Sequence, residues 1–222
     1  RGPRRAGTRM AVYPNVRFLK SAHEASQFCE DFGAEVAFAG RSNSGKSSAI
    51  NAIVQRRDLA RTSRTPGRTQ LVNFFELAPG ERLVDLPGYG YAQVPPEMRE
   101  HWRRLMDAYF GARTSLAGLF IVMDARRPLA ETDWRMIELA RSRACPVHVL
   151  LSKADKLGRN EARATLQRTR AELGEAAGAQ LFSALNKEGV DQARAVLGRM
   201  LARQALVPEV EASSARPWQS RA

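Results

Sequence analysis

The chain has 222 residues, of which 44% are hydrophobic, which is enough for one globular domain whose core needs no disulfide or zinc. Its 35 lysines and arginines against 23 acidic residues give a formal net charge of +12, which favours a polyanionic partner such as nucleic acid. The two cysteines lie far apart and no apolar run suits a membrane span or a signal peptide, so we expect a cytoplasmic protein that does not enter membranes.

Residues 1–13 form a basic segment that we expect to be flexible, and the Pro/Ser-rich residues 207–222 are expected to be a disordered tail. Between them, residues 14–206 alternate short β-branched segments with longer segments of helical period, which predicts one domain with a mostly parallel sheet. The predicted strands are 35–40, 71–77, 82–86, 116–125, 146–152 and 179–184, and the predicted helices are 45–55, 96–111, 131–143, 159–174 and 188–204. The short "APGE" turn makes the second and third strands an antiparallel hairpin.

The first motif, "GRSNSGKSS" at residues 40–48, directly follows the apolar run "EVAFA". Gly40, Gly45, Lys46 and Ser47 match the G-x-x-x-x-G-K-[ST] spacing of a phosphate-binding loop. Such a loop cradles phosphates with backbone amides and the amino end of a helix. Lys46 would reach the β- and γ-phosphates and Ser47 would offer its hydroxyl to Mg²⁺. A chance Gly/Ser turn is the alternative, and the strand before the loop and the helix after it speak against that.

An arginine-rich connection follows the first predicted helix, from residue 56 to residue 70. It is long for a compact domain, and loops of that length are usually functional. We interpret it as a contact surface for a polyanion, although a general preference of the genome for arginine is the alternative. Its basic residues are Arg56, Arg57, Arg61, Arg64 and Arg68.

Two further motifs stand at predicted strand ends. "LVDLPG" places Asp85 three residues before Gly88, a spacing in which the carboxylate holds Mg²⁺ through a water and the glycine amide senses the γ-phosphate. "SKAD" places Asp155 where its carboxylate can accept both the N1–H and the 2-amino group of guanine, while the stem of Lys153 packs along the base. In "FSA", the amide of Ala184 would donate to guanine O6. Each motif alone is weak, and their order is what indicates a guanine nucleotide.

Together, "GRSNSGKSS", "ARTSRTPGRTQLVNFFEL", "VDLPGYGYA", "SKAD" and "FSA" resemble the EngB (YihA/YsxC) family of bacterial GTP-binding proteins, in the TrmE-Era-EngA-EngB-septin-like GTPase superfamily. The resemblance covers residues 14–204. It implies a Ras-like P-loop GTPase, a three-layer α/β/α domain whose six-stranded, mostly parallel sheet has one antiparallel strand. It also implies a GTP- and GDP-binding switch that assists assembly of the large ribosomal subunit and supports growth and cell division.

By the same resemblance, Thr69 ligates Mg²⁺ beside Ser47, while Asp85 acts through a water. Lys46, Thr69, Gly88 and Asn43 are the expected catalytic residues. The expected nucleotide contacts are Gly40, Arg41, Ser42, Asn43, Ser44, Gly45, Lys46, Ser47, Gly67, Arg68, Thr69, Gln70, Leu71, Asp85, Leu86, Pro87, Gly88, Ser152, Lys153, Ala154, Asp155, Phe182, Ser183 and Ala184.

Hydrolysis is expected to be slow, because Tyr89 stands where Ras-like enzymes place a water-orienting glutamine. Asn43 occupies the phosphate-loop position at which some related GTPases help to bind K⁺, so K⁺ is a possible cofactor. The expected partner is a precursor of the large ribosomal subunit, contacted at rRNA through the basic loops by a monomeric protein. Two alternatives are an ATP-dependent enzyme, which "SKAD" disfavours, and a nucleic-acid-binding module with a mainly structural nucleotide site.

Overall fold

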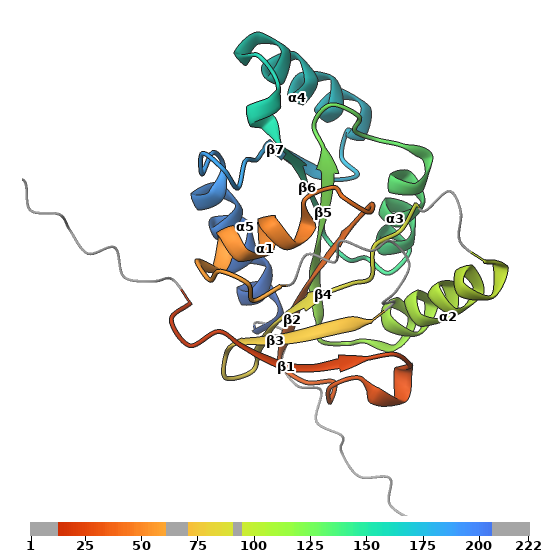
Figure 1. The fold of residues 1–222 in the computed structure, drawn as a ribbon. Helices are drawn as coiled ribbons and strands as arrows, with labels where there is room; N and C mark the ends of the chain where they lie inside the picture. Colours follow the sequence, from red (N-terminus) through yellow and green to blue (C-terminus); the bar gives the residue numbers. More distant parts are fainter. Residues whose placement is uncertain (1–12, 61–70, 91–94, 206–222) are drawn as a thin grey trace, which may run out of the picture.

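The computed structural model describes residues 13–60, 71–90 and 95–205, and its centre is a seven-stranded sheet (Figure 1). The strands lie in the order β1-β3-β4-β2-β5-β6-β7. Their bounds are β1 Arg17–Ala22, β2 Ala34–Gly40, β3 Val72–Ala78, β4 Glu81–Asp85, β5 Leu116–Asp124, β6 Val147–Ser152 and β7 Gly178–Leu181. The helices are α1 Lys46–Val54, α2 Pro96–Ala112, α3 Glu131–Arg141, α4 Arg159–Leu173 and α5 Val190–Ala205, with short 3-10 turns η1 Ala25–Gln27 and η2 Ala154–Lys156.

The mostly parallel α/β prediction is confirmed, and so is the hairpin of β3 and β4. Only β3 runs against its neighbours in the described sheet. The predicted count of six strands is wrong, because β1 adds a seventh at the edge beside β3, where Phe18 faces Phe75. As an edge strand, β1 leaves most of its side chains outside the core and therefore lacks a clear apolar pattern.

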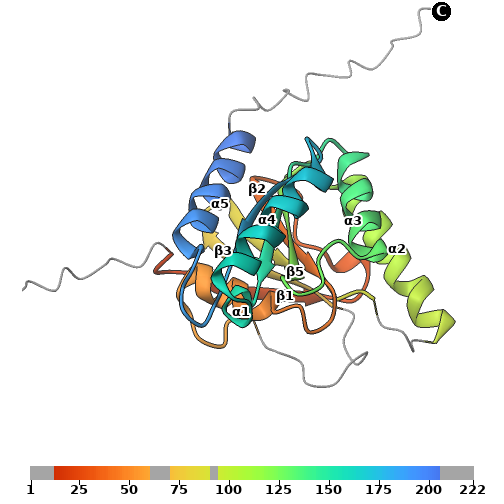
Figure 2. The same ribbon diagram turned by 90° about the horizontal axis from the view of Figure 1, so that it is seen from above.

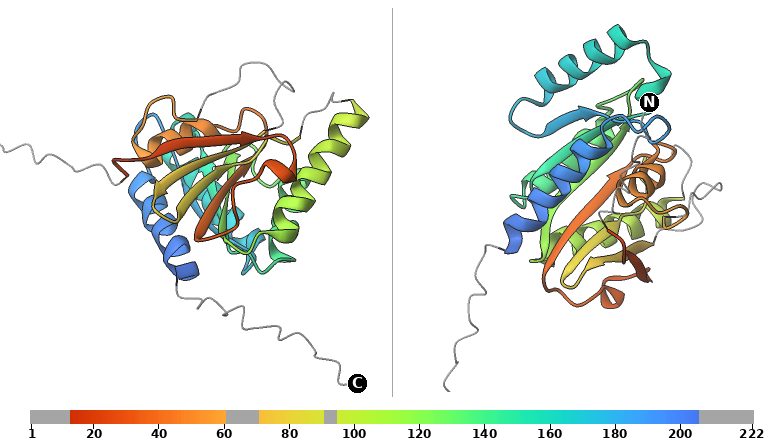
Figure 3. Two further views of the ribbon diagram at one scale, coloured as in Figure 1. Left: turned by 90° about the horizontal axis from the view of Figure 1, so that it is seen from below. Right: turned by 90° about the vertical axis from the view of Figure 1, so that its left-hand side faces the viewer.

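Helices cover both faces of the sheet and make three layers. Alternate residues of β2 point to opposite faces: Val36 and Phe38 pack with α1 and α5, whereas Ala37 and Ala39 pack on the side of α2 and α3. Figures 2 and 3 show α5 and α2 on opposite sides of the sheet. The carboxyl ends of the parallel strands therefore lie at one edge of the sheet, which is the usual place for a ligand in such folds.

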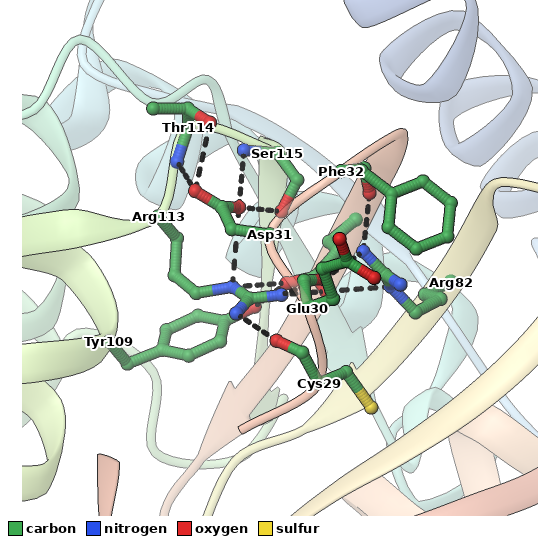
Figure 4. Close-up of polar contacts among 10 residues, drawn as sticks. Cys29, Glu30, Asp31, Phe32, Arg82, Tyr109, Arg113, Thr114 and Ser115 are labelled. Atoms are coloured by element: carbon green, nitrogen blue, oxygen red, sulfur yellow. Dashed lines mark hydrogen bonds and ion pairs between the residues drawn. The ribbon is translucent and has the colours of Figure 1, made fainter. Parts of the chain in front are cut away.

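The amino ends of the same strands hold a cluster of charged side chains (Figure 4). We call Asp31, Glu35, Arg82 and Arg113 the ion network. The carboxylate of Glu35, which is fully buried, pairs with Arg82 at 2.8 Å and with Arg113. The Arg113 guanidinium also donates to the carbonyl of Cys29 at 2.7 Å. The network fastens the end of α2 and the loop before β2 to the sheet.

Within the described ranges, no helix combines the length and apolar character needed to cross a membrane. The domain boundaries drawn at 13/14 and 206/207 remain predictions.

Candidate functional site

The phosphate-loop motif lies between β2 and α1, as its spacing predicts. β2 ends at Gly40, and α1 starts at Lys46 with Gly45 as its N-cap at a φ of +92°. A side chain at position 40 does not fit, since a Cβ there would lie 2.6 Å from the Ser44 hydroxyl and 2.7 Å from the Val122 carbonyl. The backbone is thus drawn into a tight loop that ends at an uncapped helix start, which is the geometry that binds phosphate.

Lys46 and Asp85 come together although 39 residues separate them. Asp85 ends β4, which pairs with β2 so that Phe38 and Asp85 are partners in the ladder. The Lys46 ammonium contacts a carboxylate oxygen of Asp85, and the two side chains are only 12% and 8% exposed. The structure therefore places the predicted phosphate lysine beside the predicted magnesium aspartate, and the two charges neutralise each other.

The residues at this point fit a magnesium ion. Ser47 lies in the first turn of α1, and Asp85 contacts its neighbour Lys46, so the available donors are hydroxyl and carboxylate oxygens, which Mg²⁺ prefers. The neighbouring Ser44 hydroxyl is buried without a hydrogen-bond partner in the described part of the chain. The same part contains no group of three acidic, histidine or cysteine side chains that could hold a metal ion.

The predicted guanine site lies at the ends of β6 and β7. The Ser183 hydroxyl donates to Asp155 at 2.6 Å, and the Ala154 amide donates to the Phe182 carbonyl at 3.1 Å, so "SKAD" and "FSA" form one unit. The Ser152 hydroxyl contacts the carbonyl of Ser44 in the phosphate loop. The predicted base and phosphate subsites are thereby in direct contact.

Lys153 provides a second connection between the two subsites. Its ammonium donates to the Asn43 carbonyl at 2.6 Å and pairs with Asp124 at 3.0 Å. Hydrogen bonds from Arg126, at 2.7 and 2.9 Å, lower the pKa of Asp124 well below its usual range and keep it anionic. Sequence reasoning missed Asp124. Its only signal was an acid at a strand end in "VMDARR", which by itself has no special spacing.

Several predicted contacts have no structural description. Gly67, Arg68, Thr69 and Gln70 lie outside the described residues, as do Arg61 and Arg64, while Leu71 directly precedes β3. Leu86 and Pro87 are buried at the end of β4, and Gly88 next to them is partly exposed. The Leu86 amide donates to the Phe38 carbonyl at 2.9 Å, which continues the line of β4 towards the phosphate loop.

The three-layer fold and this ordered set of motifs define a P-loop GTPase. Residues 35–153 match a family model described as 50S ribosome-binding GTPase. A "Probable GTP-binding protein EngB" of Stenotrophomonas maltophilia is 50% identical over 190 residues, which cover 84% of this chain and 95% of that protein. Its counterpart in Xanthomonas euvesicatoria pv. vesicatoria is 49% identical over 84% and 92% of the two chains. The chain therefore belongs to the EngB family of GTP-binding proteins.

Solved structures agree in fold. The crystal structure of a probable GTP-binding protein EngB superimposes with a TM-score of 0.62 at 20% identity, over 77% of this chain and all of that one. Aquifex aeolicus Era bound to GDP.AlF4- gives 0.59 at 17% identity, over 75% and 56% of the two chains. At such identities the likeness concerns the fold, and the family rests on the sequence matches.

Proposed function

We propose that this GTPase is a slow molecular switch that assists assembly of the large ribosomal subunit and thereby supports growth and cell division. The observation that carries the proposal is membership of the EngB family together with the match to a model described as 50S ribosome-binding GTPase. The net charge of +12 supports a partner rich in phosphate. A switch of this kind would bind a precursor particle as a monomer in the cytoplasm.

A basic surface beside the nucleotide site supports an rRNA contact. An open pocket of about 640 Å³ lies between the end of α1 and the start of α5, and Ser48 and Ala184 border it next to the guanine and phosphate subsites. Exposed Arg56, Arg57 and Lys187 line it together with the exposed acids Asp58 and Asp191, so cationic side chains are in excess. Arg56 and Arg57 begin the arginine-rich connection that leads towards Thr69, so nucleotide and RNA would meet at neighbouring segments.

The proposed magnesium ligands are Ser47, Thr69 and, through a water, Asp85. When bound, Mg²⁺ would offset the negative charge of the phosphates while the γ-phosphoryl group is transferred to water. Lys46 would then exchange its contact with Asp85 for the β- and γ-phosphates, and Gly88 would offer its amide to the γ-phosphate. Hydrolysis would be slow, because the Tyr89 hydroxyl donates to Asp133 at 2.9 Å and is therefore engaged away from an attacking water.

K⁺ is the proposed additional cofactor, held near Asn43. The Asn43 backbone has a φ of +61° and its carbonyl accepts the Lys153 ammonium, so this residue is fixed between the two subsites. Turnover should be faster in KCl than in NaCl at equal ionic strength, and Asn43→Ala should remove the difference. Equal rates of the unchanged protein in both salts would contradict a role for K⁺.

Co-sedimentation with large-subunit precursor particles tests the switch. Binding should be stronger with a non-hydrolysable GTP analogue than with GDP, by roughly 5- to 150-fold, and should fall steeply along a KCl series. Arg56→Glu with Arg57→Glu should reduce binding, whereas Arg159→Glu with Arg163→Glu on α4, the same charge change at two exposed positions elsewhere, should reduce it less. Replacing Arg61 and Arg64 with Glu applies the same test to the rest of the connection. Equal binding with both nucleotides would refute the switch, and a flat salt response would refute the RNA contact.

A further inference from the structure

Asp133 is a fully buried carboxylate to which none of the nucleotide motifs assigns a role. It lies in the first turn of α3, and its carboxylate contacts polar groups from three segments of the chain. The Ala130 amide donates to it at 3.0 Å, the Tyr89 hydroxyl donates to its other oxygen at 2.9 Å, and the Arg41 guanidinium pairs with it at 3.2 Å. Arg41 belongs to the phosphate loop and Tyr89 directly follows Gly88, so one buried charge joins the two motifs that face the phosphates.

The backbone connects the same two segments. Arg41 and Tyr89 form an isolated parallel bridge, in which the Ser42 amide donates to the Tyr89 carbonyl at 3.1 Å and the Tyr89 amide donates to the Gly40 carbonyl at 3.3 Å. The Tyr89 side chain is buried against the ring of Trp102 in α2. The Trp102 indole in turn donates to the Pro87 carbonyl at 3.4 Å. Both neighbours of Gly88 are therefore anchored.

Burial raises the pKa of the Tyr89 phenol well above its usual value, and Asp133 raises it further, so Tyr89 stays a neutral donor at physiological pH. The Arg41 guanidinium also donates to the Arg127 carbonyl, and its Nε lies 3.2 Å from the Asp133 carboxylate as an ion pair without a hydrogen bond. Burial raises the pKa of the Asp133 carboxyl, whereas the Tyr89 hydroxyl, Arg41 and the Ala130 amide lower it, so these three partners favour the ionised form. Removing one of them would leave a buried polar group poorly satisfied, which is costly.

We propose that Asp133 is a positioning residue that holds Gly88 at a set distance from the phosphate loop through Tyr89 and Arg41, and so helps the protein to distinguish GTP from GDP. The inference rests on the proposed role of the Gly88 amide as a contact for the γ-phosphate. An amide held in advance loses no freedom on binding, which favours the ligand that possesses a γ-phosphate. GDP does not reach Gly88 and should not depend on the arrangement.

The test compares two buried phenols. Tyr89→Phe removes only the hydroxyl that donates to Asp133. Tyr109→Phe is the matched control, because its hydroxyl donates to the buried Glu35 at 3.3 Å at the opposite end of the sheet. Dissociation constants for GDP and for a non-hydrolysable GTP analogue are measured for each variant, together with the thermal unfolding midpoint. Asp133→Asn, with the exposed Glu131→Gln of the same helix turn as control, provides a second pair.

Tyr89→Phe and Asp133→Asn should weaken GTP-analogue binding relative to GDP by about tenfold, the order expected for one hydrogen bond to a charged group. The control variants should leave that ratio unchanged, although Tyr109→Phe also lowers the unfolding midpoint. The proposal is overturned if the ratio of GTP-analogue to GDP affinity changes no more in Tyr89→Phe and Asp133→Asn than in Tyr109→Phe. The cluster would then be purely structural. Gly88→Ala is measured in parallel: an unchanged ratio there would refute the role of Gly88 itself, and with it the basis of the inference.

Discussion

The two ends of the parallel sheet both carry ion pairs, but the pairs differ in how completely they are satisfied. At the amino ends, every charge of the ion network has its partners inside the protein: Glu35 takes Arg82 and Arg113, and Asp31 takes the amides and hydroxyls of the residues that follow Arg113. At the carboxyl ends, Lys46 and Asp85 have each other and lie beside a loop shaped for phosphate. We call the amino ends the closed end, because their charges are paired within the protein. We call the carboxyl ends the open end, because Lys46 and Asp85 can exchange their contact for a bound ligand.

The comparison shows that residue type alone does not distinguish a structural ion pair from a functional one. A lysine or arginine next to a carboxylate occurs at both ends, and most of the side chains are largely buried at both. What differs is the backbone around them. Backbone carbonyls around the ion network accept hydrogen bonds from Arg82 and Arg113, although the Arg82 Nε contacts Glu35 without a hydrogen bond. Lys46 instead lies at the start of a helix, whose first amides have no intrahelical acceptor.

The largest effect is expected from breaking the closed end. Glu35→Gln leaves the buried Arg82 guanidinium without a countercharge and leaves Arg113 with only the more distant Asp31, at 3.7 Å. The substitution should lower the free energy of unfolding by about 3–5 kcal/mol, measured by urea titration. Glu76→Gln is the control: its partner Arg17 is exposed, so the loss should stay below about 1 kcal/mol. GTP affinity of the folded Glu35→Gln protein should be unchanged. A similar loss of unfolding free energy in both variants would show that the ion network stabilises the fold no more than an exposed ion pair does.

The second effect concerns the guanine subsite at the open end. Asp155→Asn should weaken GTP binding by about 2–3 kcal/mol, because a charged acceptor for two donors is lost, and should favour xanthine nucleotides with a carbonyl at position 2. Competition between GTP and XTP for the same site measures it. The free energy of unfolding should change far less than in Glu35→Gln. If the Asp155→Asn variant still prefers GTP, the assignment of Asp155 to the base is contradicted.

A smaller effect is expected at the link between the two subsites. Asp124→Asn removes the charge that holds the Lys153 ammonium, and should weaken GTP and GDP binding alike by about 0.5–1 kcal/mol, since this pair is partly exposed. Direct nucleotide titration measures it. Asp107→Asn on α2, an acid in an exposed pair with Arg103, is the control and should leave affinity unchanged. If Asp124→Asn weakened binding of only one of the two nucleotides, Asp124 would be assigned to the phosphate contacts instead.

The last effect is a pH dependence of stability at the amino ends of the strands. Partial burial opposes ionisation of Asp31, but hydrogen bonds from Ser115 and Thr114 outweigh it and lower its pKa from 3.8 to about 2. Because the folded-state pKa lies below the ordinary value, Asp31 stabilises the fold above about pH 4, and this contribution disappears as the pH falls towards 2. Urea titrations between pH 2 and 5 should show a difference between the unchanged protein and Asp31→Asn that shrinks across this window. A constant difference would contradict the lowered pKa.

Much of the site was predictable because its motifs are local. A strand, a glycine-containing loop and a helix start follow one another within residues 35–55, and the backbone conformation of such a stretch depends on the residues themselves. The same holds for Asp85 and Asp155 at strand ends, where apolar runs stop at a charged residue. Parallel strands all end at one edge, so the predicted order of elements already implied that these motifs meet.

What the sequence by itself determined, then, is the class of fold, the position of most strands and helices, and the motifs that identify a guanine-nucleotide site. Only the tertiary structure decided that β1 joins the sheet as a seventh strand, that Asp124 holds Lys153, and that Asp133 joins Arg41 to Tyr89. These features depend on pairs 29 to 92 positions apart, as between Lys153 and Asp124 or Asp133 and Arg41. An isolated acid in a sequence has no spacing that reveals its partner, because burial and the surrounding donors arise only when distant segments pack together.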